Sequence, residues 1–165
     1  MAKEARPRNL PLLTEAEVEE RRPILLAGIQ QYNDGYFFEA HETWEDLWLQ
    51  SPMPIRNFLQ GIIQMSAAFV HLMRHEYPGT IGLLGAALEK LEGLPADYMG
   101  IDLAPLVAEA RRAHEELAAL GQDRFEEWDQ GRIPQIRLLK KGKARGARGR
   151  QRAASSRRAR GTAGR

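Results

Sequence analysis

The segment from about Ile55 to Glu76 constrains the fold more than any other, because apolar residues cover nearly every face of the helix that it predicts. Such a helix needs neighbours on several sides to remove its side chains from water. Turn sequences with proline and glycine bound the segment, at 51–54 before it and at 77–79 after it. The sequence therefore predicts a central, buried helix with other elements packed around it.

The segments around this helix also show helical patterns, and none shows the sustained alternation that is typical of a strand. A capping box at 14–17 predicts the start of a short helix, and Asn33-Asp34-Gly35 predicts the end of the next one. The further predicted helices run over about 23–33, 36–50, 80–91 and, with Asp102 as the cap, 102–120. We expect an all-α fold, a compact bundle of five or six helices with short connections.

The last part of the chain differs from the rest in composition. Residues 125–139 show no clear pattern, although Trp128 and Ile136 are candidate anchors onto the bundle. From Lys140 on there are 11 Lys or Arg and no acid, so the preceding part carries 13 bases against 22 acids, a net charge of −9. We expect an N-terminal segment with a short helix over 1–22, one helical domain over 23–139 and a disordered basic tail over 140–165.

Composition and motifs exclude several classes of function. The chain has no cysteine, so disulfides and thiolate metal sites are excluded. The acidic body argues against a nucleic-acid-binding core. The basic tail is either a site of weak, non-specific nucleic acid binding or a solvated extension. No phosphate loop, nucleophile elbow or dinucleotide motif is present, and the sequence predicts neither an enzyme class nor an oligomeric state.

Two features bear on the cellular compartment. The N-terminus lacks the apolar region of a secretory signal. The longest apolar stretch, at 58–73, is too short for a membrane span and is interrupted by polar side chains. We therefore expect a cytoplasmic protein without a membrane partner.

His41, Glu45 and Trp48 share one stripe of the helix predicted over 36–50, because spacings of four and seven residues return to the same side of a helix. Aromatic residues lie on or beside the same stripe: Phe37, Phe38 and Trp44. We therefore predict that His41 and Glu45 lie within the most apolar surface of their helix. The two tryptophans of this helix are expected to anchor the core rather than to stack on a ligand.

Gln60, Gln64 and His71 form a second polar stripe, on the central helix. Buried polar groups cost free energy unless they find hydrogen-bond partners. We expect the two stripes to face each other and to form one internal polar site. Gln60 and Gln64 are candidate ligand contacts, although partial exposure near the start of the helix explains Gln60 equally well.

Two interpretations of this site are open. A His and a Glu one helical turn apart can bind one ion, and His71 would complete a His41/Glu45/His71 set suited to zinc or another first-row divalent metal. Alternatively, Glu45 accepts a hydrogen bond from His41 or His71 and completes a buried network. The spacing alone favours the network. The metalloprotease pattern His-Glu-x-x-His and the carboxylate–histidine pattern of di-iron bundles are both absent.

Several motifs together resemble a known family. The run from Asn33 to Glu42, followed by Trp44, Glu45 and Trp48, is similar to the signature of the bacterial and archaeal domain of unknown function 309, whose hallmark is His-x-x-x-Glu-x-x-Trp/Tyr. The residues 58–64 with Ala67, Ala68 and His71 resemble its second block, and 100–103 resemble a third. The likeness covers about 23–120.

The resemblance implies an all-helical fold and a proposed metal-binding role for His41, Glu45 and Trp48. It implies no activity, because none is established for the family. One departure lies at Glu76-Tyr77-Pro78-Gly79, where the family has a Gly-Asn segment. If that segment helps to form the site, the rim of the site is altered in this chain.

We interpret the chain as a small helical protein in which His41, Glu45, Gln64 and His71 bind a divalent metal ion or a small polar ligand, with Gln60 and Trp48 as further contacts. Two alternatives stay open. One is a non-catalytic interaction module whose polar cluster only specifies the core. The other is a metal-dependent hydrolase that activates water at open coordination positions.

Overall fold

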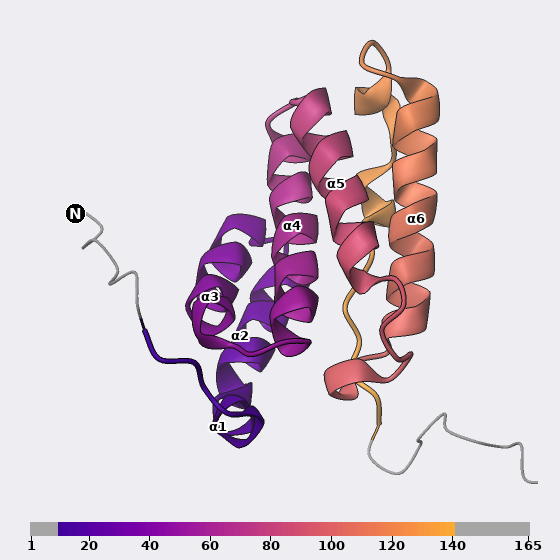
Figure 1. Ribbon diagram of the computed structural model, residues 1–165. Coiled ribbons are helices and arrows are strands. Elements are labelled where there is room, and N and C mark those ends of the chain that lie inside the picture. Colours follow the sequence, from indigo (N-terminus) through magenta and orange to yellow (C-terminus); the bar gives the residue numbers. More distant parts are fainter. Residues whose placement is uncertain (1–9, 141–165) are drawn as a thin grey trace, which may run out of the picture.

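The computed structural model describes residues 10–140 (Figure 1). The described residues form six α-helices: α1 (Glu15–Glu20), α2 (Arg22–Asn33), α3 (Phe37–Gln50), α4 (Ile55–Met73), α5 (Tyr77–Leu91) and α6 (Leu103–Leu120). Three short 3-10 turns accompany them: η1 (Tyr98–Gly100), η2 (Phe125–Glu127) and η3 (Gln130–Arg132). Over 10–140 there is no strand beyond one isolated bridge, so the predicted all-α bundle is confirmed. The predicted disorder of the tail falls, from residue 141 on, outside the described residues.

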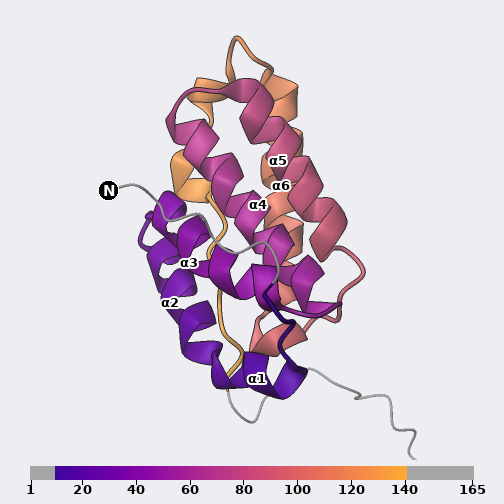
Figure 2. The ribbon, with the colours of Figure 1, turned by 60° about the vertical axis from the view of Figure 1, so that its left-hand side comes forward.

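Helix α4 is central, as its sequence predicts. It lies between α3 and α5 and makes its most extensive contacts with these two helices (Figures 1 and 2). Gly61 lets α4 and α5 approach closely, because a Cβ at this position would lie 2.6 Å from Cδ2 of Leu91. No helix within 10–140 is long and apolar enough to cross a membrane.

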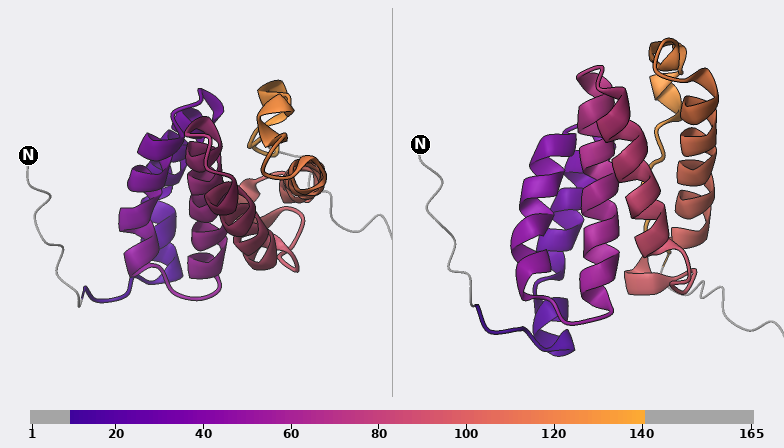
Figure 3. Two further views of the ribbon diagram at one scale, coloured as in Figure 1. Left: turned by 90° about the horizontal axis from the view of Figure 1, so that it is seen from above. Right: turned by 45° about the horizontal axis from the view of Figure 1, so that its top comes forward.

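Helices α2 and α3 pack against the other side of α4. The indole N–H of Trp44 donates to the carbonyl oxygen of Leu25 at 3.1 Å, which ties α3 to α2 inside the core. Trp44 is fully buried, so its prediction as a core anchor is confirmed. Helix α6 lies on the far side of α5 from α3 (Figure 3).

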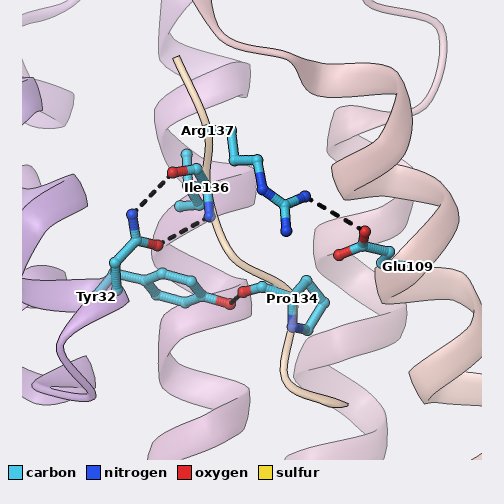
Figure 4. A network of polar contacts seen from close by, with 6 residues as sticks. Tyr32, Glu109, Pro134, Ile136 and Arg137 are labelled. Carbon is cyan, nitrogen blue, oxygen red and sulfur yellow. Dashed lines mark hydrogen bonds and ion pairs between the residues drawn. The ribbon is translucent and has the colours of Figure 1, made fainter. Parts of the chain in front are cut away.

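The chain after α6 returns along the bundle and lies between α2 and α6 (Figure 4). The Tyr32 hydroxyl donates to the carbonyl oxygen of Pro134 at 2.8 Å. The Asn33 amide donates to the carbonyl oxygen of Ile136 at 2.8 Å, and its own oxygen accepts from the Ile136 N–H at 2.9 Å. Trp128 and Ile136 are buried, so both predicted anchors are confirmed.

Several predicted helix ends shift. The capping box of Thr14 and Glu17 is present. Asp102 is the N-cap residue of α6, as predicted, although its side chain accepts no capping hydrogen bond. Helix α5 begins at Tyr77 rather than near residue 80, because Pro78 in the first turn of a helix sacrifices no intrahelical hydrogen bond.

Candidate functional site

Five of the predicted site residues form a band along the α3–α4 pair, which we call the polar strip: His41, Glu45 and Trp48 on α3, and Gln60 and Gln64 on α4. All five are intermediate in exposure. The strip therefore lies at the edge of the core and reaches the surface, rather than forming the wholly internal site predicted from the sequence.

The error arises from one residue of helical rotation. The buried face of α3 consists of Phe37, Ala40, Trp44 and Leu47. Each α3 residue of the strip directly follows one of these, and one residue turns a helix by about 100°. Phe38, which the sequence placed with the apolar surface, is 48% exposed. The strip is thus rotated about a quarter turn away from the core.

The same holds for α4. Most of its residues are buried, but a line along the helix stays half-buried: Arg56, Gln60, Gln64, Ala67 and His71. Gln60 and Gln64 thus occupy the partly exposed side of the most buried helix. This position agrees with the expectation that the Gln60 side chain is partly exposed to solvent.

The register of α3 and α4 follows from one hydrogen bond. The Ser66 hydroxyl donates to the carbonyl oxygen of Phe37 at 2.6 Å. The two helices are antiparallel, so the turn that joins them is reached from this pair by counting up along α3 and down along α4. His41 lies four residues along α3 and Gln64 two residues along α4, so at a rise of 1.5 Å their heights differ by about 3 Å. The structure therefore brings His41 and Gln64 to the same level.

Three side-chain atoms of the strip are buried and have no hydrogen-bond partner within the described residues: Nδ1 of His41, Nε1 of Trp48 and Oε1 of Gln64. Most buried polar atoms in proteins are hydrogen-bonded, and each one that is not costs about 1–3 kcal/mol. All three lie on one surface of two adjacent helices. The strip is thus the part of the α3–α4 pair where buried polar atoms lack partners among the described residues.

Aromatic and cationic groups flank these atoms. The Arg56 guanidinium lies over the Trp48 ring, 5.0 Å from its centroid, which is a favourable cation–π geometry. The rings of Phe38 and His41 are 6.1 Å apart. Sequence reasoning missed Arg56, although its spacing of four residues before Gln60 continues the stripe.

Comparison with family models gives one match, over residues 25–83, to the domain of unknown function DUF309. The chain is therefore similar to this family over residues 25–83. The matched residues run from α2 into α5 and contain the whole polar strip together with His71. The match confirms the family predicted from the motifs. A comparison with curated proteins finds no match.

His71 lies apart from the strip, although it is within the DUF309 segment. Its Nδ1 is 2.6 Å from Oε2 of Glu76. Its ring rests on the first turn of α5, where a Cβ on Gly79 would lie 2.5 Å from Nδ1. His71 follows Gln64 by seven residues, which is about 10 Å along α4. The structure thus does not bring His71 to His41.

The metal site that the DUF309 resemblance implies can be tested against this geometry. Within 10–140 no group of three or more His, Cys, Asp or Glu side chains could hold a metal ion. The predicted set fails because His71 pairs with Glu76 near the end of α4. His41 and Glu45 alone are fewer ligands than the three or four that zinc sites use. The residues present do not fit the predicted three-ligand metal centre.

His71 instead lines an open pocket of 430 Å³ between the α4–α5 turn and η2. His75 lies in the same pocket, with Nδ1 3.1 Å from Oε1 of Glu126. The sequence departure at Glu76-Tyr77-Pro78-Gly79 was the signal for this arrangement, since it supplies both the carboxylate and the glycine that hold the His71 ring. Glu126, about 50 residues further on, left no signal in the sequence.

Proposed function

We propose that the polar strip is the binding site for a small polar ligand. The observation that carries this proposal is the set of three buried atoms without partners among the described residues: His41 Nδ1, Trp48 Nε1 and Gln64 Oε1. A purely structural cluster would satisfy its own members, because unsatisfied buried groups weaken the fold. A ligand that supplies the missing hydrogen bonds recovers that free energy on binding.

The three atoms define the chemistry of the ligand. The indole N–H of Trp48 only donates, and Oε1 of Gln64 only accepts. Nδ1 of His41 donates or accepts, depending on the tautomer. The ligand therefore needs both an acceptor and a donor, as an amide, an amino acid or a hydroxy acid has. His41 and Trp48 are seven residues apart, so a ligand that reaches both is about 10 Å long.

The proposal assigns no metal to the strip, since the residues present do not supply the predicted three ligands. Arg56 above the Trp48 ring adds a positive charge at that end of the strip. It favours a ligand whose acceptor is partly or fully negative, such as a carboxylate or an amide oxygen.

The indole N–H signals of the three tryptophans test this proposal in a ¹H–¹⁵N NMR titration. The probe is N-acetylglycinamide, which carries amide donors and acceptors; acetate, glycine, glycerol and zinc chloride form the comparison panel. We expect a saturable shift of the Trp48 signal with N-acetylglycinamide. The Trp44 and Trp128 signals should stay in place, because their N–H groups already donate to Leu25 and Glu116.

Variants fix the location of the response. Gln64→Leu should abolish it or weaken it about tenfold, since the lost hydrogen bond is worth about 1 kcal/mol or more. Gln30→Leu, the same change on the exposed side of α2, should leave it unaltered. The absence of a saturable shift with every organic probe, or equal binding by Gln64→Leu, would refute the proposal. Stoichiometric binding of zinc alone would replace it with a metal site.

A further inference from the structure

An open pocket of 260 Å³, which we call the arginine pocket, lies between α6 and the chain segment that returns after it. Its charged side chains are Glu109, Arg112 and Glu116 on α6, with Arg132 and Arg137 on the returning segment. Three positive and two negative charges leave a net charge of +1. The chain up to residue 139 has a net charge of −9, so the pocket is a basic site on an acidic body. It also lies outside the residues that match DUF309.

The two glutamates of the pocket are already paired with the returning segment. Glu116 accepts at both oxygens: Nη2 of Arg132 donates to Oε1 at 2.7 Å, and Nε1 of Trp128 donates to Oε2 at 2.8 Å. Oε1 of Glu109 lies 3.6 Å from Nη1 of Arg137, and Figure 4 shows these two side chains facing each other. The acids therefore compensate two of the three guanidinium charges and hold Arg132 and Arg137 against α6.

Arg112 carries the charge that is left over. It follows Glu109 by three residues and precedes Glu116 by four, the spacings at which oppositely charged side chains pair along a helix. Both acids pair with the returning segment instead, and Arg112 forms no ion pair or hydrogen bond within 10–140. A guanidinium keeps its proton at any ordinary pH. Arg112 therefore presents an uncompensated positive charge to the pocket.

The two paired arginines also keep hydrogen-bond donors for a ligand. Each guanidinium has five N–H groups, and Arg132 uses one of them for Glu116. The 3.6 Å between Arg137 and Glu109 is longer than a hydrogen bond, so this ion pair occupies no donor of Arg137. The planar N–H fork of arginine matches the oxygens of a carboxylate or a phosphate. Three such forks, from two segments of the chain, line one pocket.

We infer that the arginine pocket binds a small oxyanion with two negative charges, of the kind that a phosphate monoester or a dicarboxylate provides. One charge pairs with Arg112, and the other oxygens accept from the remaining N–H groups of Arg132 and Arg137. The bound anion links α6 to the returning segment, which Tyr32 and Asn33 fasten to α2. The pocket shares no residue with the polar strip, so this inference does not depend on the proposed function.

The indole N–H of Trp128 provides a signal for this pocket in a ¹H–¹⁵N NMR titration of the full-length protein. It donates to the carboxylate that also accepts from Arg132, so an anion on Arg132 changes its surroundings. The probes are methyl phosphate, at a pH where it is a dianion, and succinate. We expect a saturable shift of the Trp128 signal, whereas the buried Trp44 signal stays in place and sodium chloride at equal ionic strength gives no saturation. The probe that binds more tightly distinguishes a phosphate ligand from a dicarboxylate.

Variants of α6 locate the binding and separate it from net charge. Arg112→Gln should weaken it about tenfold, because a charge-assisted hydrogen bond is lost. Arg111→Gln is the matched control: it has the same change in charge at the adjacent position, where Arg111 pairs with Glu92, and it should bind like the parent. Glu109→Gln removes a negative charge from the pocket and should tighten binding about twofold. These opposite signs cannot come from a general loss of folding.

Two results would overturn the inference. One is the absence of a saturable Trp128 shift with both dianions. The other is equal binding by Arg112→Gln and Arg111→Gln, since the anion would then respond to the overall charge of the protein and not to this pocket.

Discussion

Trp44 and Trp48 lie one turn apart on α3, yet they show two different uses of the same side chain. Trp44 is fully buried, packs against Tyr32 and donates its indole N–H to Leu25. Trp48 is half-buried beneath Arg56, and its equally buried N–H has no partner within 10–140. The first tryptophan meets every requirement of a core residue. The second leaves a hydrogen bond unmade.

The difference separates a closed face of one helix from a partly exposed face that we propose as a binding surface. The face with Phe37, Ala40, Trp44 and Leu47 is closed and its polar atoms are paired. The polar strip beside it carries three atoms whose desolvation is not compensated among the described residues. Proteins tolerate such costs mainly at functional sites, where a ligand restores the missing contacts. The comparison therefore assigns stability to the closed face, and it supports the proposal that the strip binds a ligand.

The largest expected effect comes from truncating the two tryptophans. Trp44→Ala should lower the free energy of unfolding by about 3–5 kcal/mol, because it leaves a large cavity in the core and removes the hydrogen bond that ties α3 to Leu25 of α2. Trp48→Ala should cost about 1 kcal/mol, since half-buried packing is lost but an unsatisfied N–H is also removed. Urea unfolding followed by circular dichroism measures both. Equal losses would erase the distinction between the faces.

Sequence periodicity identified both faces of α3 but mistook the position of their boundary. His41, Glu45 and Trp48 do form one stripe, as the spacing predicts. Whether that stripe faces the core depends on where α2 and α4 pack, and no local pattern contains that information. Phe38 contributed to the error, because an exposed aromatic residue and a buried one look alike in a sequence.

Contacts between residues that are distant in the chain could not be predicted from the sequence for a related reason. Trp128 and Ile136 were recognisable as apolar anchors, but their partners were not. The Asn33 side chain binds the backbone of Ile136 across 103 positions of the chain. His71 was recognisable as a polar residue on an apolar helix, while its partner Glu76 depended on the exact start of α5. Residue types are readable from a sequence, but pairings between distant elements require the fold.

An intermediate effect is expected at Tyr32, which tests the closed side of the comparison. Its hydroxyl is buried and donates to Pro134 (Figure 4). Tyr32→Phe should cost about 1 kcal/mol at neutral pH, because the Pro134 carbonyl loses its donor. The loss of stability is similar to that expected for Trp48→Ala. Unlike Trp48→Ala, however, Tyr32→Phe should leave the binding of N-acetylglycinamide at the strip unchanged.

The stability difference between wild type and Tyr32→Phe should also depend on pH. Burial, and secondarily the negative charge of Glu109, raises the pKa of the Tyr32 phenol well above its ordinary value. The unfolded phenol ionises near pH 10, whereas the folded one keeps its proton. The stability from Tyr32 is therefore complete below pH 10 and lost as pH rises through the folded pKa. The difference between wild type and Tyr32→Phe should shrink above pH 10. A constant difference would show that the buried hydroxyl is not protonated preferentially in the fold.

The smallest change in the free energy of unfolding is expected for Gln64→Leu. The sign of this change tests whether the strip differs from the closed face of α3. Gln64→Leu replaces a side chain whose buried oxygen has no partner among the described residues with an apolar one of similar size. Removing an unsatisfied acceptor is neutral or stabilising, by up to about 1 kcal/mol. Gln60→Leu, one turn away on the same line of α4, is the matched control and should change stability by less than about 0.5 kcal/mol. Urea unfolding of both variants gives the two values.

If Gln64→Leu instead destabilises the fold by more than about 1 kcal/mol while Gln60→Leu does not, then Gln64 holds a structural hydrogen bond. The strip would then belong to the core, as Trp44 does, and its assignment as a binding face would fail.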